Sequence, residues 1–426
     1  MRLNYRRTFF LGFAFLSISA FWQLYDSIIP LILKHTFEIG DTLAGVIMAL
    51  DNVLALFMLP LFGAISDRIS TPIGKRMPFI IGGTAAAVIS MILLPISDNL
   101  VNLPMFIIAL FITLVAMRVY RSPAVALMPD VTPKPLRSKA NGVINLMGAL
   151  GAVVSLVLIR LLVPDAGKPD YFPIFAIVGG LMVGAVVVLF FTINENKLVA
   201  EMERLDGHGT DKKESKGTLG AKMAPGVKRS FIFILLSIFF WFMSYNAVTT
   251  AFSKYAQDFL GIKGGGFANS LLLATGAAVL TFMPAGMIAS RLGRKRTILG
   301  GVALMFVSFV LAFGFTSYSP FINVLLVLIG MGWALINVNS YPMVVEMAKG
   351  SDVGKFTGYY YTSSMAGQIL TPILSGALLE HVGYRTLFPY AAFFMAVAFI
   401  TMSFVKHGDS KPLTPQDKLE MLDVGD

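Results

Sequence analysis

The chain has 426 residues, of which 56% are hydrophobic and only 14% are charged, and its net charge is +10. A water-soluble protein carries about 25% charged residues, so this composition excludes a protein whose whole surface faces water. The basic excess is divided among short loops and forms no patch, which argues against a nucleic-acid partner. The chain has no cysteine and its four histidines are scattered, so disulfides, thiolate chemistry and a metal site are not expected.

Twelve apolar runs, each close to the length that crosses a lipid bilayer, follow one another along the chain. Irregular backbone cannot face lipid and no alternating strand pattern occurs, so the runs predict twelve transmembrane helices. The first run is too long for an ordinary signal peptide and is expected to be retained. The predicted helices cover residues 8–33, 42–66, 79–97, 104–128, 140–163 and 173–193, then 231–252, 266–289, 297–316, 320–345, 356–379 and 385–405.

The predicted helices form two sets of six on either side of a polar stretch. We therefore expect an all-α integral membrane protein with two pseudo-symmetric six-helix bundles, at 1–193 and 230–405. Residues 194–229 mix both charge signs with Gly, Ser and Thr, which predicts a linker that begins as a short surface helix. Residues 406–426 are a polar tail. Lys and Arg concentrate after even-numbered helices, in the linker and at both ends of the chain, which places these segments on the cytoplasmic side of a multi-pass protein of the cell membrane.

A hairpin motif occurs once in each half. The sequence GAISDR at 63–68, followed by GKR at 74–76, returns as GMIASR at 286–291, followed by GRKR at 293–296. The offset is 286 − 63 = 223 residues, and each copy separates two apolar runs. Such a duplication is typical of membrane proteins in which two bundles give alternating access to a central site, so the repeat favours transport.

Weaker similarities between the halves have nearly the same offset. Gly151 in the fifth predicted helix corresponds to Gly367 in the eleventh (367 − 151 = 216). Phe21-Trp22 in the first helix corresponds to Phe240-Trp241 in the seventh (240 − 21 = 219). Their near-constant spacing supports the duplication.

The two hairpins match the signature loop of the major facilitator superfamily, and the chain resembles that superfamily over essentially its whole length. The sequences GAISDRISTPIGKRMPFI at 63–80 and RSPAVALMPDVTPKPLRSKANG at 121–142 resemble the glycoside–pentoside–hexuronide:cation symporters, and more closely their sucrose-transporter-like branch. The resemblance implies sugar transport coupled to a cation. Sodium-coupled relatives bind sodium through acidic residues where this chain has Ala55, Leu59 and Arg121. Sodium coupling is therefore disfavoured, and a proton is the expected coupling ion.

Four charged residues are predicted to lie well inside the membrane: Asp26, Asp51, Arg118 and Arg121. Such residues cost roughly 2.5–3.5 kcal/mol each on insertion scales and usually face the interior of a bundle. We interpret the four as the proton-coupling site, and favour Asp26 as the titrating group because its counterpart in the second half, Asn246, is neutral. The alternative is a fixed ion pair that joins three helices.

Sugar binding requires an aromatic face and polar groups that contact hydroxyls. The first helix supplies such groups one turn apart, and the second half supplies comparable ones. Each residue could equally pack between helices. The predicted substrate-binding residues are Trp22, Gln23, Asp26, Arg118, Asn145, Tyr245, Asn246, Trp333, Asn337, Tyr360 and Gln368.

Six further charged residues are expected at cytoplasmic helix ends. They would form pairs between helices that hold the inward gate shut, with Asp67 favoured, or alternatively anchor the helices at lipid headgroups. The predicted gating residues are Asp67, Arg68, Asp130, Arg137, Arg291 and Glu346.

These patterns together predict a secondary active transporter, a proton-coupled symporter of a sugar or glycoside of di- or oligosaccharide size. Its partners would be the sugar and the lipid bilayer, with the protein a monomer. No nucleophile–base pair, nucleotide loop or metal cluster occurs among the helices, so neither an enzyme nor a cofactor is expected. The alternatives are a facilitator or exporter of an amphipathic, lipid-like molecule, and a membrane sugar sensor that does not transport.

Overall fold

The computed structural model describes residues 4–133, 137–207, 224–347 and 353–409, and the regular structure in these ranges is helical. The first half contains α1 (Tyr5–His35), α2 (Asp41–Arg68), α3 (Met77–Asn99), α4 (Leu103–Asp130), α5 (Arg137–Leu162) and α6 (Phe172–Thr192). The second half contains α8 (Pro225–Lys254), α9 (Phe267–Leu292), α10 (Arg294–Ala312), α11 (Pro320–Val345), α12 (Val353–His381) and α13 (Leu387–Ser403). The short helix α7 (Glu195–Gly207) follows the first six, and the single turns are η2 (Tyr255–Phe259), η3 (Gly264–Gly266) and η5 (Tyr384–Thr386).

In the part of the chain that the structure describes, eleven helices are long and apolar enough to cross a membrane. The remaining long helix, α12, has the more polar central sequence YYYTSSMAGQ at 359–368, and it packs between α2 and α8. The outward surface is apolar, with Met283 83% and Leu280 78% exposed, as expected for side chains that contact lipid. The predicted all-α fold of two six-helix bundles is confirmed. The residue bounds of the four predicted segments stay predictions, and α8 begins at Pro225, inside the predicted linker.

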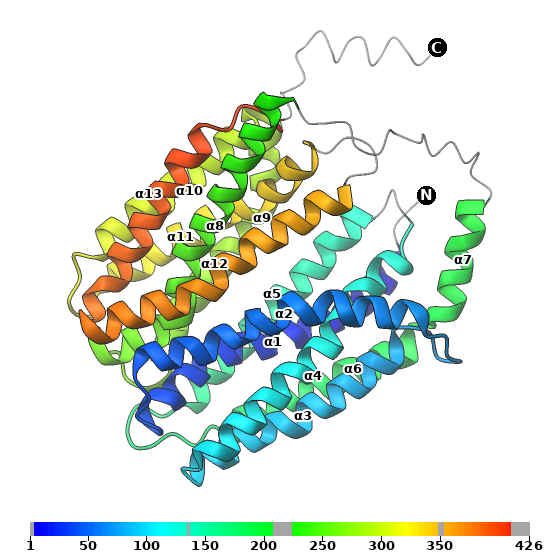
Figure 1. Ribbon diagram of the computed structural model, residues 1–426. Coiled ribbons are helices and arrows are strands. Elements are labelled where there is room, and N and C mark those ends of the chain that lie inside the picture. The colour runs from blue at the N-terminus through cyan, green and yellow to red at the C-terminus, as the bar shows by residue number, and fades with distance from the viewer. Residues whose placement is uncertain (1–3, 134–136, 208–223, 348–352, 410–426) are drawn as a thin grey trace.

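The bundle has two ends, which we name by the features that mark them. At the α7 end, α1 begins and α2 ends, and α7 lies beside the first half (Figure 1). At the Asp41 end, α1 ends and α2 begins. In Figure 1, α2 and α12 lie together at the Asp41 end and separate towards the α7 end.

Gly151 and Gly367, which correspond to each other in the internal repeat, occupy equivalent positions in the two halves. A Cβ atom on Gly151 of α5 would overlap the backbone carbonyl of Leu16 on α1, and one on Gly367 of α12 would press on the carbonyl of Phe239 on α8. The α1 and α8 positions are again separated by 239 − 16 = 223 residues. In each half the absence of a side chain therefore allows the same two helices to approach closely.

Hydroxyl groups one turn further along make the same two contacts. Ser155 Oγ donates to the carbonyl of Ala20 (2.7 Å), and Thr371 Oγ1 donates to the carbonyl of Met243 (3.3 Å). The offsets, 371 − 155 = 216 and 243 − 20 = 223, equal those of the glycine contacts. The internal duplication is therefore repeated at the level of single hydrogen bonds.

In each half, a carboxylate caps the helix that follows the hairpin motif. The carboxylate comes from the segment after the last helix of that half, which is α6 in the first half and α13 in the second. Glu195 accepts hydrogen bonds from the backbone N–H groups of 75–77 at the start of α3 (3.0–3.1 Å). Asp409 accepts from the N–H groups of Arg294 and Lys295 at the start of α10 (2.6 and 3.2 Å). Both caps satisfy amide groups that lack a partner in the helix, and their negative charge suits a helix N-terminus.

The two halves touch most closely where α2 crosses α12. A Cβ atom on Gly45 would overlap the carbonyl of Pro372, and one on Gly376 would overlap the carbonyl of Asp41. Both contacts lie in the Asp41-end part of the helices. The two backbones can approach this closely only because neither glycine carries a side chain.

Candidate functional site

The centre of the first half is organised around Arg118 of α4, which is 1% exposed. Its Nη2 atom forms an ion pair with the Asp51 carboxylate on α2 and also donates to the Asp51 backbone carbonyl (3.1 Å). Its guanidinium carbon lies 4.5 Å from the centroid of the Trp22 ring on α1. One arginine therefore joins three helices through an ion pair and a cation–π contact.

Asp26 lies one helical turn beyond Trp22 on α1 and is half-buried. It interacts electrostatically with Arg118, and across the boundary between the halves with Tyr245 of α8. Within the ranges that the structure describes, Asp26 forms no ion pair, whereas Asp51 is paired. The two predicted carboxylates therefore occupy different environments.

Arg121 lies on α4 about one turn closer to the α7 end than Arg118, and it is half-buried. It interacts electrostatically with Arg118, which has the same charge, and with Tyr361 of α12 in the second half. No carboxylate among the described residues forms an ion pair with Arg121. All four residues predicted for proton coupling therefore lie on α1, α2 and α4, but only Asp51 and Arg118 form a pair.

The second half contributes aromatic rings to the same region. Tyr245 of α8 and Trp333 of α11 are stacked, with ring centroids 3.9 Å apart and an angle of 3° between the planes. Phe242 meets Trp333 edge to face at 5.2 Å. Because Tyr245 also interacts with Asp26, the stack lies opposite the charged residues of the first half. Predicted residues of both halves are thus brought together.

Other predicted substrate-binding residues use their polar groups within the protein. Gln23 donates to Ser27 Oγ (3.0 Å), and Gln368 donates to the carbonyl of Ser364 (3.3 Å), both within their own helices. The buried Tyr360 hydroxyl lies 3.1 Å from Ser340 Oγ of α11. Of the three asparagines, Asn246 is buried, whereas Asn145 and Asn337 are exposed.

The predicted gating residues lie at the α7 end, and their described contacts join helices of the same half. Asp67 forms an ion pair with Arg76, and Asp130 pairs with both Arg76 (2.9 Å) and Lys75 (3.2 Å). In the second half Glu346 forms an ion pair with Arg294. Arg68 and Arg291 are exposed, and the side chain of Arg137 lies outside the described part of the chain. Arg76 and Arg294 were not predicted as partners, although the repeated basic residues after each hairpin motif are the signal that marks them.

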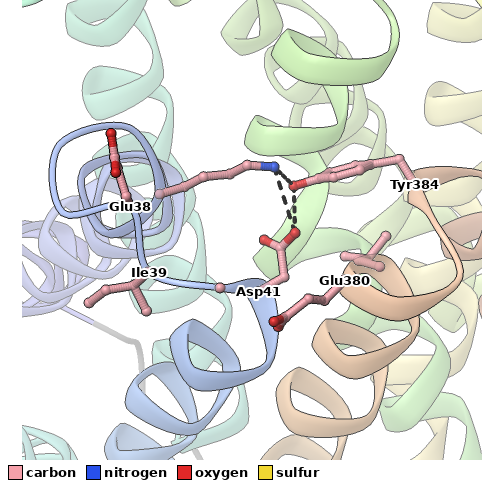
Figure 2. Close-up of a pocket in the computed structure, with 8 residues that line it drawn as sticks. Glu38, Ile39, Asp41, Glu380 and Tyr384 are labelled. Carbon is pink, nitrogen blue, oxygen red and sulfur yellow. Dashed lines mark hydrogen bonds and ion pairs between the residues drawn. The ribbon is translucent and has the colours of Figure 1, made fainter.

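A second charged cluster, which sequence reasoning missed, joins the two halves at the Asp41 end. We call it the Asp41 network: Asp41, Lys34, Lys254, Asp258 and Tyr384. Asp41 accepts from Lys254 Nζ (2.5 Å) and from the Tyr384 hydroxyl (2.8 Å), and Lys34 pairs with Asp258 (2.8 Å). Lys34 also pairs with Asp41 (3.6 Å), and Figure 2 shows the Asp41 and Tyr384 side chains pointing toward one another. Their interaction could not be read from the sequence, because Asp41 and Lys254 are 213 residues apart.

A pocket of about 410 Å³ lies beside this network, and both halves line it (Figure 2). The lining residues are Lys34, Glu38, Ile39, Gly40, Asp41, Leu379, Glu380 and Tyr384. Glu380 accepts a hydrogen bond from the backbone N–H of Thr42 (2.7 Å), a further contact between the halves. Among the described residues, the hydrogen bonds and ion pairs between the first and second halves all lie at the Asp41 end.

Two curated relatives match part of the chain. The MFS-type transporter ppzB of Metarhizium majus (strain ARSEF 297) is 31% identical over 131 residues, and that of Metarhizium rileyi (strain RCEF 4871) is 32% identical over 131 residues. Each match covers 30% of this chain and 28% or 27% of the relative, so the chain aligns with under a third of either relative.

Two solved structures match almost the whole chain. The POT family transporter PepTSo has a TM-score of 0.69 and 13% identity, covering 95% of this chain and 98% of its own. A point mutant of the nucleoside transporter NupG has a TM-score of 0.69 and 15% identity, and the match covers 94% of this chain and 100% of the NupG chain. At these identities the likeness shows the fold alone. The family model of the Major Facilitator Superfamily matches residues 11–283 and 270–422, and the chain belongs to this superfamily of transporters.

Proposed function

We propose that the protein is a secondary active transporter that couples proton movement to symport of a sugar or glycoside, of di- or oligosaccharide size, by alternating access. We assign it to the glycoside–pentoside–hexuronide:cation symporters, in the sucrose-transporter-like branch. We further propose that it acts as a monomer in the cell membrane, with the α7 end in the cytoplasm.

The different environments of Asp26 and Asp51 carry the proposal. Asp51 is neutralised by Arg118, whereas Asp26 is near Arg118 but forms no ion pair among the described residues. Water around a carboxylate favours the charged form, and drying the site favours the protonated form. Closure around a substrate would therefore promote proton binding at Asp26, and reopening would release the proton.

The aromatic groups on the facing half support a sugar as substrate. The Tyr245–Trp333 stack offers a rigid apolar platform, and Trp22 adds a third ring from the first half. The hydroxyl-bearing edge of a sugar needs charged or amide partners, which Asp26 and Asn337 would supply.

The distribution of contacts between the halves supports alternating access. At the Asp41 end the Asp41 network and the α2–α12 crossing join the halves. At the α7 end, the described ion pairs of Asp67, Asp130 and Glu346 stay within one half. We therefore interpret the structure as a state closed at the Asp41 end, with access from the α7 end.

Transport by single-residue variants in proteoliposomes tests the proposal. Under an imposed pH gradient, Asp26→Asn should abolish accumulation of a labelled disaccharide but keep exchange of substrate between the two sides, which requires no net proton movement. Asp165→Asn, an exposed residue at the Asp41 end, is the matched control and should accumulate normally.

The proposal fails if Asp26→Asn and Asp51→Asn both retain proton-driven accumulation. If uptake by the unaltered protein does not depend on the pH gradient, a facilitator or exporter of amphipathic molecules would be favoured. Binding without any uptake would favour a membrane sugar sensor.

A further inference from the structure

The end of α1 carries two basic residues that contact the same carboxylate of the second half. Lys34 Nζ lies 2.8 Å from one oxygen of Asp258 on η2, and His35 Nε2 lies 3.0 Å from the other oxygen. Lys34 and His35 are the last two residues of α1. Both oxygens of this second-half carboxylate are therefore bound by the first half.

The two contacts differ in how they respond to pH. Lysine keeps its charge at neutral pH, whereas histidine gains or loses its charge between about pH 5 and 8. The His35 side chain is 42% exposed, so it exchanges protons with the solution at the Asp41 end. A neutral imidazole still forms a hydrogen bond to Asp258. An imidazolium adds a charge, and hydrogen bonds between charged groups are roughly twice as strong as neutral ones.

The charges around His35 are balanced while this residue is neutral. Within the Asp41 network, Lys34 and Lys254 carry two positive charges, and Asp41 and Asp258 carry two negative ones. A proton on His35 is opposed by the neighbouring Lys34 and attracted by Asp258, with which His35 is in direct contact. The charged or titratable groups of α1, α2, α8, η2, α12 and η5 at this junction, with the loop between α1 and α2, are Lys34, Glu38, Asp41, Lys254, Tyr255, Asp258, Glu380, His381, Tyr384 and Arg385.

The contact between His35 and Asp258 exists only while the two halves meet at the Asp41 end. Opening this end would separate the end of α1 from η2 and leave His35 in water. The closed state therefore binds a proton on His35 more tightly than the open state does. By linkage, the same proton must favour the closed state, so acidification favours closure and a rise in pH through the range of histidine favours opening.

We infer that His35 is a regulatory proton-binding residue, which holds the Asp41 end closed when the solution at that end is acidic. It is separate from the proposed coupling carboxylate Asp26 and requires no substrate. In the orientation proposed above, the solution concerned is outside the cell, and acid there would slow the return of the empty carrier to outward access. An exposed ion pair changes an equilibrium by about fivefold at most, so His35 adjusts the closed population rather than setting it.

Distances between spin labels on the two halves measure the closed fraction. Val101 and Tyr318 are exposed residues of opposite halves at this end, and the chain has no native cysteine, so Val101→Cys and Tyr318→Cys provide the labelling sites. Asp26→Asn is included so that the proposed coupling group does not contribute. Without substrate, lowering the pH from 8 to 5 should raise the ratio of short to long distances by about two- to fivefold.

Two variants keep the charge at position 35 constant. His35→Arg is positive at both pH values and should give the higher closed fraction at pH 5 and at pH 8. His35→Gln can donate a hydrogen bond but carries no charge, and it should give the lower fraction at both. His381→Gln is the matched control, because this exposed histidine ends α12 and forms no ion pair with the first half among the described residues. It should keep the full pH response.

Every outcome bears on the inference alone. A closed fraction that stays the same between pH 8 and pH 5 would overturn it, as would a pH response that persists in His35→Gln. Loss of the response in His381→Gln would also overturn it, because a different histidine would then be responsible. None of these results decides whether the protein transports a sugar with a proton, since the distances are measured without substrate and without the Asp26 carboxylate.

Discussion

Arg118 has three partners on two other helices: the Asp51 carboxylate, the Asp51 backbone carbonyl and the face of the Trp22 ring. Burying two opposite charges costs desolvation energy that their attraction only partly offsets. Removing one member therefore leaves the other as a buried, uncompensated charge. The loss should be larger than the net contribution of the intact pair.

The first prediction concerns this pair. Arg118→Gln should lower the free energy of unfolding by about 3–5 kcal/mol, because Asp51 loses its cation. The double variant Arg118→Gln with Asp51→Asn should recover part of that loss, since neither charge remains. Denaturant unfolding of the purified protein in detergent measures both. A double variant less stable than Arg118→Gln alone would contradict the explanation.

Sequence reasoning found the residues at this scale but not their pairing. The cost of a charge inside the membrane marked Asp26, Asp51, Arg118 and Arg121 without a structure. Which carboxylate meets Arg118 depends on the rotation of α1 and α2 about their own axes, and packing sets that rotation. Hydrophobic periodicity could not supply it, because these helices are apolar over most of their circumference.

At the scale of elements, the close pairs α1–α5 and α8–α12 share one equivalent glycine contact. Gly151 and Gly367 face the backbone of the neighbouring helix, so any side chain there must push the helices apart. The helices α5 and α12 also carry Gly142 and Gly358, each nine residues before the close-contact glycine (151 − 142 = 9, 367 − 358 = 9). A Cβ atom at either position would meet nothing within 4 Å. The chain thus supplies its own matched controls.

The second prediction compares these glycines. Gly151→Leu and Gly367→Leu should each reduce the yield of folded protein and lower its thermal stability, since overpacking costs about 1–3 kcal/mol or more where backbone must move. Gly142→Leu and Gly358→Leu should cost little. Fluorescence-detected size exclusion and thermal unfolding provide the comparison. Equal loss in all four variants would show that helix propensity or expression, rather than the contact, is responsible.

The helices themselves were largely predictable, and their ends less so. The twelve apolar runs and the short helix of the linker correspond to observed elements, because burial in lipid requires continuous helical hydrogen bonding. α8 nevertheless begins at Pro225, several residues before the apolar run, since proline suits the first turn of a helix. The hydrophobic signal alone cannot locate such a polar first turn.

For the whole molecule, the Asp41 network is the principal polar connection between the halves. Lys254 and Asp41 are both buried, and their ion pair brings α8 of the second half against α2 of the first. Because the network joins groups from both halves, opening the Asp41 end requires these interactions to break. Its strength should therefore bias the equilibrium between the two states of the carrier.

The third prediction tests that bias. Lys254→Gln should shift the population towards a state open at the Asp41 end. Spin labels on Val101→Cys and Tyr318→Cys, two exposed sites of opposite halves at this end in a chain without native cysteine, would report longer distances. Lys263→Gln, an exposed lysine at the same end, should leave the distribution unchanged. Identical distributions in both variants would show that the ion pair does not hold this end closed.

The conformational state was the feature least accessible to sequence reasoning. The duplication and the alternation of basic loops predict two bundles and their orientation. Which end is closed depends on contacts between residues far apart in the chain, such as Asp41 with Lys254, and Thr42 with Glu380. In sequence these charges look like ordinary loop residues.

The Glu195 cap on α3 also has a consequence for the covalent tether between the bundles. Because Glu195 begins α7, this helix is fastened to the first half, and the connection to the second half starts only after Gly207. From there to Pro225 it comprises residues 208–224, which is 224 − 207 = 17 residues, and such a length can span at most roughly 60 Å. The Glu195 cap therefore keeps α7 with the first half in any rocking motion of one bundle against the other.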